Sequence, residues 1–296
     1  MNSTVALIMV VLTIGNIVAC LWLIWWTAKR RGDKSVNEPE TTGHEWDGIK
    51  ELNNPMPRWW LGLFIITIVF GGVYFFLYPG LGTYNGSGNW SSTTQLAQEQ
   101  ASAQAAFDTR FNRVATTDIV ALSKDTEAMA AAKNLFANNC SVCHGSDARG
   151  AKGFPNLTDD DWLWGGAPET IYETIANGRK GVMPAWGAML GQQGVEEASA
   201  YVLSLSGREA PADWVAAGKA RFETICIACH GVDGTGNQTL GAPNLTDNVW
   251  LYGHSMATLR ETIGNGRNNE MPAHMPILGE TKVKMLAAYV YGLSHQ

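Results

Sequence analysis

A five-residue pattern, Cys-x-x-Cys-His, occurs twice in the chain, at residues 140–144 and 226–230. Two cysteines followed directly by a histidine are typical of c-type haem attachment, in which the cysteines form thioethers and the histidine binds the iron. The pattern therefore predicts two covalently bound haem c groups. The residues that attach them are Cys140, Cys143, Cys226 and Cys229, and the axial iron ligands are His144 and His230.

A Cys-x-x-Cys pair alone has two other interpretations, a redox-active dithiol and half of a zinc site. The adjoining histidine is what favours haem. Of the five cysteines, only Cys20 lies outside the two motifs, so none remain for a disulfide framework. The apolar run around Cys20 continues past it, which favours a helix interior over lipidation at a lipoprotein-like cleavage site.

The two motifs belong to a longer internal repeat. Pro155–Asp159 and Pro243–Asp247 match at an offset of 88 residues, and the same offset relates Asn177-Gly178-Arg179 to Asn265-Gly266-Arg267. Self-similarity of this kind indicates two homologous domains, at residues 124–208 and 211–296.

Each repeat begins and ends with a helical pattern. Ala128–Ala137 and Ala216–Ile225 precede the motifs, and each carries a phenylalanine one turn before the first cysteine. Val195–Leu205 and Val283–Leu293 close the repeats with an apolar face. A first helix that crosses a last helix beside a haem is the plan of class I cytochromes c, which the repeats resemble. We expect a mostly α-helical fold with two tandem class I cytochrome c domains.

The sixth iron ligands are expected to be Met183 and Met271, which occupy equivalent Met-Pro-Ala positions in the two repeats. A thioether ligand favours ferrous iron and raises the reduction potential, which suits electron transfer. Met189 and Met275 compete for this role but break the repeat alignment. The sequence leaves open whether each methionine binds the haem of its own repeat or, by an exchange of loops, that of the other.

Arg179 and Arg267 stand in matching Asn-Gly-Arg turns just before the methionine loops. A guanidinium group forms charge-assisted hydrogen bonds with carboxylates, so both arginines are candidates to contact haem propionates. The alternative is an ordinary solvated loop arginine.

Two apolar runs, about 5–26 and 59–78, are long enough to cross a bilayer as helices. They define a membrane anchor over residues 1–83 with a loop at 27–58, and a polar linker follows over residues 84–123. The cations of the loop are Lys29, Arg30, Arg31, Lys34, Lys50 and Arg58. This concentration predicts a cytoplasmic loop, which puts both haem domains on the periplasmic side of a bacterial inner membrane.

The lipid bilayer is thus one expected partner, and the 12 tryptophans fit anchoring at its interfaces. The net charge of −6 and the lack of a basic stripe argue against a nucleic-acid partner.

The loop contains a distinctive segment, His44–Trp60, with the sequence HEWDGIKELNNPMPRWW, and Tyr78–Gly82 reads YPGLG after the second apolar run. Together with the two membrane helices and the two haem repeats, these segments resemble the dihaem subunit, CcoP or FixP, of cbb3-type cytochrome c oxidases over essentially the whole chain. The resemblance implies that electrons pass from a donor cytochrome c through two haems to a monohaem c subunit, and then to a catalytic subunit with b-type haems and copper. This chain would then need no general acid, base or nucleophile of its own.

A different function remains open, that of a membrane-anchored dihaem cytochrome serving a dehydrogenase or a quinol-oxidising complex. Such a protein has the same haem chemistry but no reason to share the His44–Trp60 segment. A dihaem peroxidase would require an iron that can open a coordination site, and the two matching Met-Pro loops argue against it.

Overall fold

The computed structural model of the chain describes residues 2–28, 41–52 and 56–295. Four of the loop cations, Lys29, Arg30, Arg31 and Lys34, lie outside these residues. The chain is mostly helical and divides into two compact units, Met1–Ala106 and Phe107–Gln296, which are described separately.

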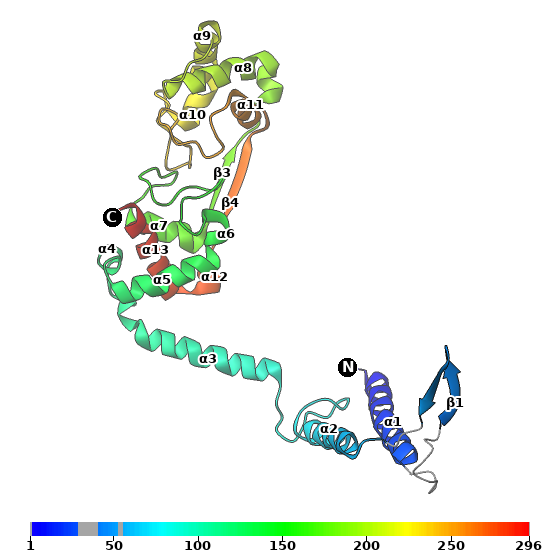
Figure 1. Cartoon of the computed structure of the whole chain (residues 1–296). Helices are drawn as coiled ribbons and strands as arrows, with labels where there is room; N and C mark the ends of the chain where they lie inside the picture. The colour runs from blue at the N-terminus through cyan, green and yellow to red at the C-terminus, as the bar shows by residue number, and fades with distance from the viewer. Residues whose placement is uncertain (1, 29–40, 53–55, 296) are drawn as a thin grey trace. The chain divides into compact units, whose positions relative to one another are not determined.

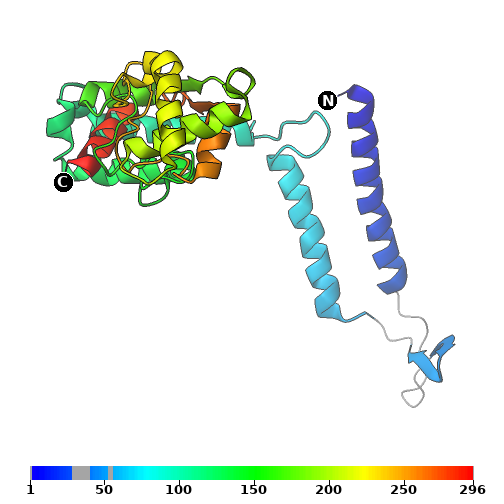
Figure 2. The same cartoon turned by 90° about the horizontal axis from the view of Figure 1, so that it is seen from above.

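The first unit contains two long apolar helices, α1 (Ser3–Ala28) and α2 (Arg58–Leu77), close to the predicted spans (Figures 1 and 2). Their mean hydropathies reach 2.6 and 2.2, and their apolar side chains are largely exposed. Apolar surfaces of this size require lipid or protein to cover them, so the helices fit a membrane anchor. Cys20 lies inside α1, where its thiol donates a hydrogen bond to the Asn16 side chain at 3.5 Å.

A short β-hairpin lies between the two helices in the sequence. Strands β1 (Thr41–Trp46) and β2 (Ile49–Leu52) pair antiparallel, with Trp46 opposite Ile49. Asp47 and Gly48 connect the strands with φ angles of +49° and +85°. Positive φ at both central residues is the geometry of a type I′ turn, for which Asp-Gly is a preferred sequence.

The segment predicted as a linker, residues 84–123, has two parts with different environments. Its first part contains the exposed helix α3 (Ser92–Arg110). Its second part forms a 3₁₀ turn, η1 (Asn112–Ala115), and the short helix α4 (Ile119–Leu122), and it buries Phe111, Val114 and Leu122. The last third of the expected linker therefore belongs to the haem-domain core, because its apolar side chains pack there.

Both repeats fold into similar series of elements. The first repeat forms α5 (Thr126–Asn139), α6 (Ser141–His144), α7 (Pro168–Asn177), β3 (Arg179–Met183) and α8 (Gly187–Leu205). The second repeat forms α9 (Ala212–Arg221), the π-helix η2 (Phe222–Cys226), α10 (Ile227–His230), α11 (Met256–Asn265), β4 (Arg267–Met271), α12 (Met275–Leu278) and α13 (Glu280–Ser294). Gly191, at φ +65°, kinks α8 at the position where Gly279 separates α12 from α13.

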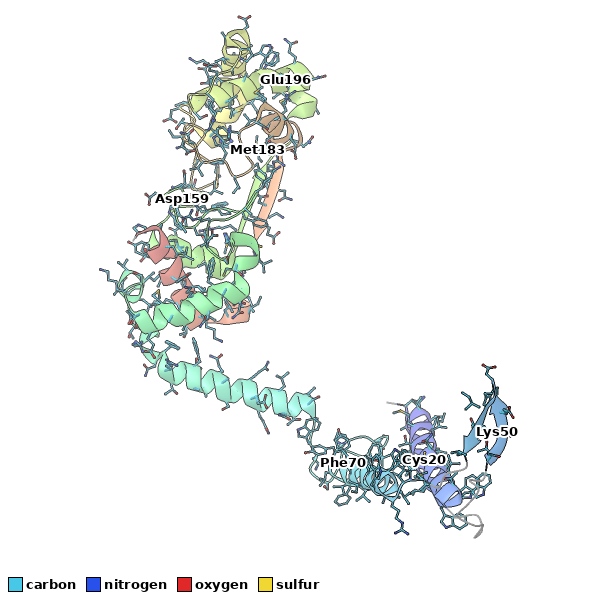
Figure 3. The ribbon with its side chains drawn as sticks, viewed as in Figure 1. Cys20, Lys50, Phe70, Asp159, Met183 and Glu196 are labelled. Carbon is cyan, nitrogen blue, oxygen red and sulfur yellow. The ribbon has the colours of Figure 1, made fainter. Side chains whose placement is uncertain are left out.

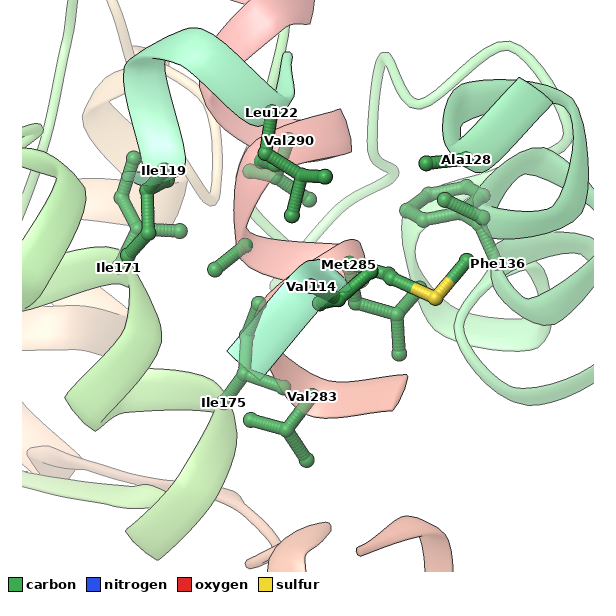
Figure 4. Close-up of a cluster of buried hydrophobic side chains, with 14 of the residues drawn as sticks. Val114, Ile119, Leu122, Ala128, Phe136, Ile171, Ile175, Val283, Met285 and Val290 are labelled. Atoms are coloured by element: carbon green, nitrogen blue, oxygen red, sulfur yellow. The ribbon is translucent and has the colours of Figure 1, made fainter. Parts of the chain in front are cut away.

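The buried side chains form two clusters, and each cluster combines helices of both repeats. In the first cluster, α5 and α7 of the first repeat pack against α13 of the second (Figure 4). In the second cluster, α9 and α11 of the second repeat pack against α8 of the first. The packing units therefore differ from the sequence domains 124–208 and 211–296, because each repeat contributes its last helix to the other.

Strands β3 and β4 connect the two clusters, because each leads from the helices of its own repeat to the last helix, which packs with the other repeat. They pair antiparallel, with Arg179 opposite Met271 and Met183 opposite Arg267. Five extended residues span about 16 Å, enough to leave one cluster and enter the other. Gly178 and Gly266 precede the strands at φ +72°, and a Cβ at either glycine would collide with backbone of the opposite methionine segment.

Two candidate haem sites

The first site is built around α5 and α6. Asp125 caps α5 by accepting hydrogen bonds from the backbone N–H groups of Glu127 and Ala128, which fixes the start of the helix. One turn before Cys140, Phe136 is only 2% exposed and packs into the first cluster. Cys140 is half-buried at the end of α5, while Cys143 on α6 is exposed.

His144 is oriented by a backbone carbonyl. Its Nδ1 lies 3.1 Å from the carbonyl oxygen of Pro155, which can only accept, so Nδ1 carries the proton and donates. This tautomer leaves Nε2 with a free lone pair, as an iron ligand requires. Burial lowers the pKa of His144 and keeps the ring neutral, and the neighbouring His274 contributes to the lowering.

The second site repeats this arrangement. Nδ1 of His230 donates to the carbonyl oxygen of Pro243 at 3.1 Å, and burial lowers the pKa of His230. Here α9 runs into the motif through the π-helix η2, whereas α5 ends at Asn139 before its motif. The two sites therefore differ in how the helix reaches the first cysteine. The difference is notable because π-helical turns are rare and often occur at functional sites.

The first cysteine of each motif does not have the lowered pKa of a redox-active thiol. Burial raises the pKa of Cys140 to about 11, and Cys143 adds to the shift. Burial likewise raises the pKa of Cys226, with a smaller contribution from Cys229. Reactive cysteines have lowered pKa values that populate the thiolate, so these raised values argue against the dithiol interpretation.

Each methionine lies with the haem motif of the other repeat. Met271 packs against the first cluster, together with Cys140 and Phe136. Met183, at the end of β3, packs against the second cluster together with Cys226 (Figure 3). Met189 is 69% exposed, whereas Met275, like Met271, packs against the first cluster.

Backbone hydrogen bonds hold both methionine loops in these places. The N–H of Trp186 donates to the carbonyl of Ile263 on α11 at 2.9 Å. At the equivalent position of the second repeat, the N–H of His274 donates to the carbonyl of Ile175 on α7 at 3.0 Å. Each loop is thus bonded to a helix of the other repeat.

Arg179 and Arg267 have matching surroundings. Arg179 donates from Nε to the Thr174 hydroxyl at 2.9 Å, and its guanidinium lies 5.1 Å from the ring centroid of Trp164. Arg267 donates to Thr262 and Glu261, and it lies 4.1 Å from the Tyr252 ring. Both arginines stand opposite a methionine in the β3–β4 ladder, next to the loops that carry the expected iron ligands.

These residues fit a haem by their chemistry. Each site offers two thiols, an imidazole Nε2 and a thioether, which are the groups that c-type haem uses. In addition, the indole N–H of Trp250 is buried without an acceptor in the second site. A carboxylate such as a haem propionate is an acceptor of the kind that this donor lacks.

Sequence reasoning did not identify the carbonyls of Pro155 and Pro243 or the aromatic partners of the arginines. The repeat did contain a signal for these residues. Pro155 aligns with Pro243 and Trp164 aligns with Tyr252, both at an offset of 88 residues. Backbone carbonyls are invisible as functional groups in a sequence, and only the fold shows which one faces a histidine.

Comparison with known proteins places this geometry in a family. A profile described as cytochrome c oxidase, cbb3-type, subunit III matches residues 127–202 and 213–290. A second profile, the N-terminal domain of cytochrome oxidase-cbb3, FixP, matches residues 38–85. The cbb3-type cytochrome c oxidase subunit CcoP of Rubrivivax gelatinosus is 46% identical, over 99% of this chain and 96% of its own length. The chain belongs to the CcoP/FixP family.

Two further family members have similar relationships to the chain. Subunit FixP of Azorhizobium caulinodans is 43% identical over 86% of this chain and 93% of its own length. Subunit CcoP of Cereibacter sphaeroides is 42% identical over 86% and 95%. Family membership identifies the chain as an electron-transfer subunit of a cbb3-type cytochrome c oxidase that binds haem c, with the catalytic and other oxidase subunits as partners.

Proposed function

We propose that this CcoP/FixP chain carries two haem c groups with crossed methionine ligation and receives the electrons of its oxidase. Met271 binds the iron of the haem at Cys140, Cys143 and His144. Met183 binds the iron of the haem at Cys226, Cys229 and His230. The observation that carries the proposal is that Met271 and Cys140 both pack against the first cluster, while Met183 and Cys226 both pack against the second.

The haem supplies reversible one-electron chemistry at its iron. The chain supplies the surroundings, because the carbonyls of Pro155 and Pro243 hold His144 and His230 in the ligating tautomer. Arg179 and Arg267 are proposed to contact haem propionates, supported by their positions opposite the methionines. A methionine ligand in each site favours a high reduction potential, as an acceptor for a donor cytochrome c requires.

The route we propose runs from a donor cytochrome c through both haems to a monohaem c subunit, and from there to the b-haem and copper centre of the catalytic subunit. Two membrane helices with the cationic loop between them support a periplasmic location of Phe107–Gln296. Electron delivery there feeds an oxygen-reducing, proton-pumping complex of the bacterial inner membrane.

Gentle detergent purification followed by haem and metal analysis tests this function. Co-purification with b-type haem, copper, a second c-type subunit and cyanide-sensitive oxygen uptake is expected. Pyridine haemochrome analysis of the isolated chain should give two haem c per polypeptide. A stable complex with only a dehydrogenase or a quinol-oxidising enzyme would overturn the assignment in favour of the alternative function.

A further inference from the structure

The hairpin of β1 and β2 is exposed along both of its strands. All ten of its strand residues are exposed, including Trp46 at 68%, Ile49 at 73% and Leu52 at 51%. A two-stranded hairpin is at best marginally stable in water unless something covers it. A solvent-exposed Trp–Ile pair next to a type I′ turn therefore indicates a surface that another molecule covers.

One face of the hairpin combines an apolar cross-strand pair with an acidic side chain. Trp46 and Ile49 are cross-strand partners and so lie on the same face beside the turn. Glu51 follows Ile49 on that face by the two-residue strand period, and it accepts a hydrogen bond from the Thr42 hydroxyl at 3.1 Å. We call Trp46, Ile49 and Glu51 the hairpin face.

The covalent connection limits what can cover this face. Only five residues separate Leu52 from Arg58, where α2 begins. Six extended steps reach about 20 Å, so the hairpin stays within that distance of the membrane end of α2. The covering surface is therefore either lipid head groups or the membrane-proximal part of an embedded protein.

The charge of the hairpin favours a protein surface over lipid head groups. The hairpin carries Glu45, Asp47 and Glu51 against one cation, Lys50. The cytoplasmic leaflet is anionic and attracts basic segments, so it repels a hairpin with excess acidic residues. A protein surface with an apolar pocket bordered by cations complements both the aromatic pair and the carboxylates.

We propose that the hairpin face docks on an apolar, cation-bordered surface at the membrane boundary of another embedded subunit of the oxidase, on the side of the bilayer opposite the haem sites. The proposal rests on the proposed function, because that function supplies the partner. The separate family match over residues 38–85, which contains the hairpin and α2 but neither haem motif, agrees with an assembly role for this segment.

The test uses the full chain expressed with its oxidase. Trp46→Ala combined with Ile49→Ala should lower the fraction of the chain that co-purifies with the other oxidase subunits by at least about tenfold, since buried tryptophans carry much of the energy of protein interfaces. Haem staining should show both haems still attached. The matched control is Trp90→Ala with Leu96→Ala, which removes an exposed tryptophan and an exposed aliphatic side chain outside the hairpin and should leave co-purification unchanged.

A charge-reversal variant distinguishes protein from lipid. Glu51→Lys, which reverses the one charge of the hairpin face, should weaken co-purification because the partner surface is cationic, whereas stronger co-purification with lipid alone would show a lipid surface and overturn the proposal. Unchanged co-purification of the Trp46/Ile49 variant would also overturn it. If the unmodified chain fails to co-purify with any oxidase subunit, the proposed function fails instead.

Discussion

Phe136 and Tyr289 lie in contact, with ring centroids 5.5 Å apart, although they come from different sequence repeats. Tyr201 and Phe222 make the reciprocal pair at 5.2 Å. Each pair marks the crossing of a first helix with a last helix. The helix crossing that defines a class I cytochrome c fold is therefore present twice. Each time, the first helix comes from one repeat and the last helix from the other.

The exchange of last helices between the repeats predicts which haem iron each methionine binds. Met271→Ala should alter the axial-ligand spectrum and lower the potential of the haem attached at Cys140, because Met271 packs in that cluster. Met183→Ala should do the same to the haem at Cys226. The measurement is a redox titration followed by optical and paramagnetic resonance spectra, in a background where one motif is removed by Cys→Ala changes. An effect of Met271→Ala on the Cys226 haem alone would refute crossed ligation.

A shortened chain tests the same exchange through folding. Ending the chain after residue 208 removes α13, so the first cluster loses one of its main helices and Met271. We expect this chain to lack a methionine-ligated haem at Cys140 and to unfold at a much lower temperature, as measured by circular dichroism and haem spectra. A stable fragment with a normal His–Met spectrum would show that the first repeat folds by itself.

The helix crossing of the second site depends on Gly218. A Cβ at this position would collide with the carbonyl oxygen of Glu197, so Gly218→Ala should cost about 1–3 kcal/mol of folding free energy, as overpacking usually does. The equivalent residue of the first repeat is Ala132, which is fully buried. Ala132→Gly is the matched control and should cost about 1 kcal/mol, mainly through helix propensity. Chemical denaturation measures both, and a Gly218→Ala variant as stable as the unmodified protein, or more stable, would contradict the predicted steric effect, because alanine is otherwise the better helix former.

An ion pair makes the second site sensitive to acid. Arg221 donates to the buried carboxylate of Glu197 at 2.6 Å, and this bond, helped by Gln193, lowers the pKa of Glu197. A lowered folded-state pKa contributes stability above the ordinary carboxyl value, and that contribution is lost as the pH falls through the lowered value. The repeat equivalents in the first site are Leu135 and Met285, which do not titrate.

Thermal unfolding at pH 7 and at pH 4 or below tests this difference. Glu197→Gln should lower the melting temperature at pH 7, and the gap to the unmodified protein should shrink as the pH falls. The haem at Cys226 should report the transition more strongly than the haem at Cys140. A constant gap across the pH range would exclude the ion pair as the source of the acid sensitivity.

The apolar spans, the two Cys-x-x-Cys-His motifs and the Met-Pro loops were readable from the sequence because each is a local pattern with one dominant physical interpretation. A run of about 20 apolar residues has few alternatives to a membrane helix. The class of fold followed from helical periodicity around the motifs. The short helix α4 and the buried Phe111 were missed, because isolated apolar residues after a polar helix do not reveal what they pack against.

The amino-acid sequence by itself indicated which groups are expected to serve a haem, namely the cysteines, His144, His230 and the two equivalent methionines. Only the tertiary structure decided which of them come together. The two repeats have similar helix patterns, so a reading of each helix by itself left both arrangements open, although only the exchanged arrangement pairs Arg221 with Glu197 and places Leu135 with Met285. Strands β3 and β4, which follow Gly178 and Gly266 and pair antiparallel, carry Met183 to the second cluster and Met271 to the first.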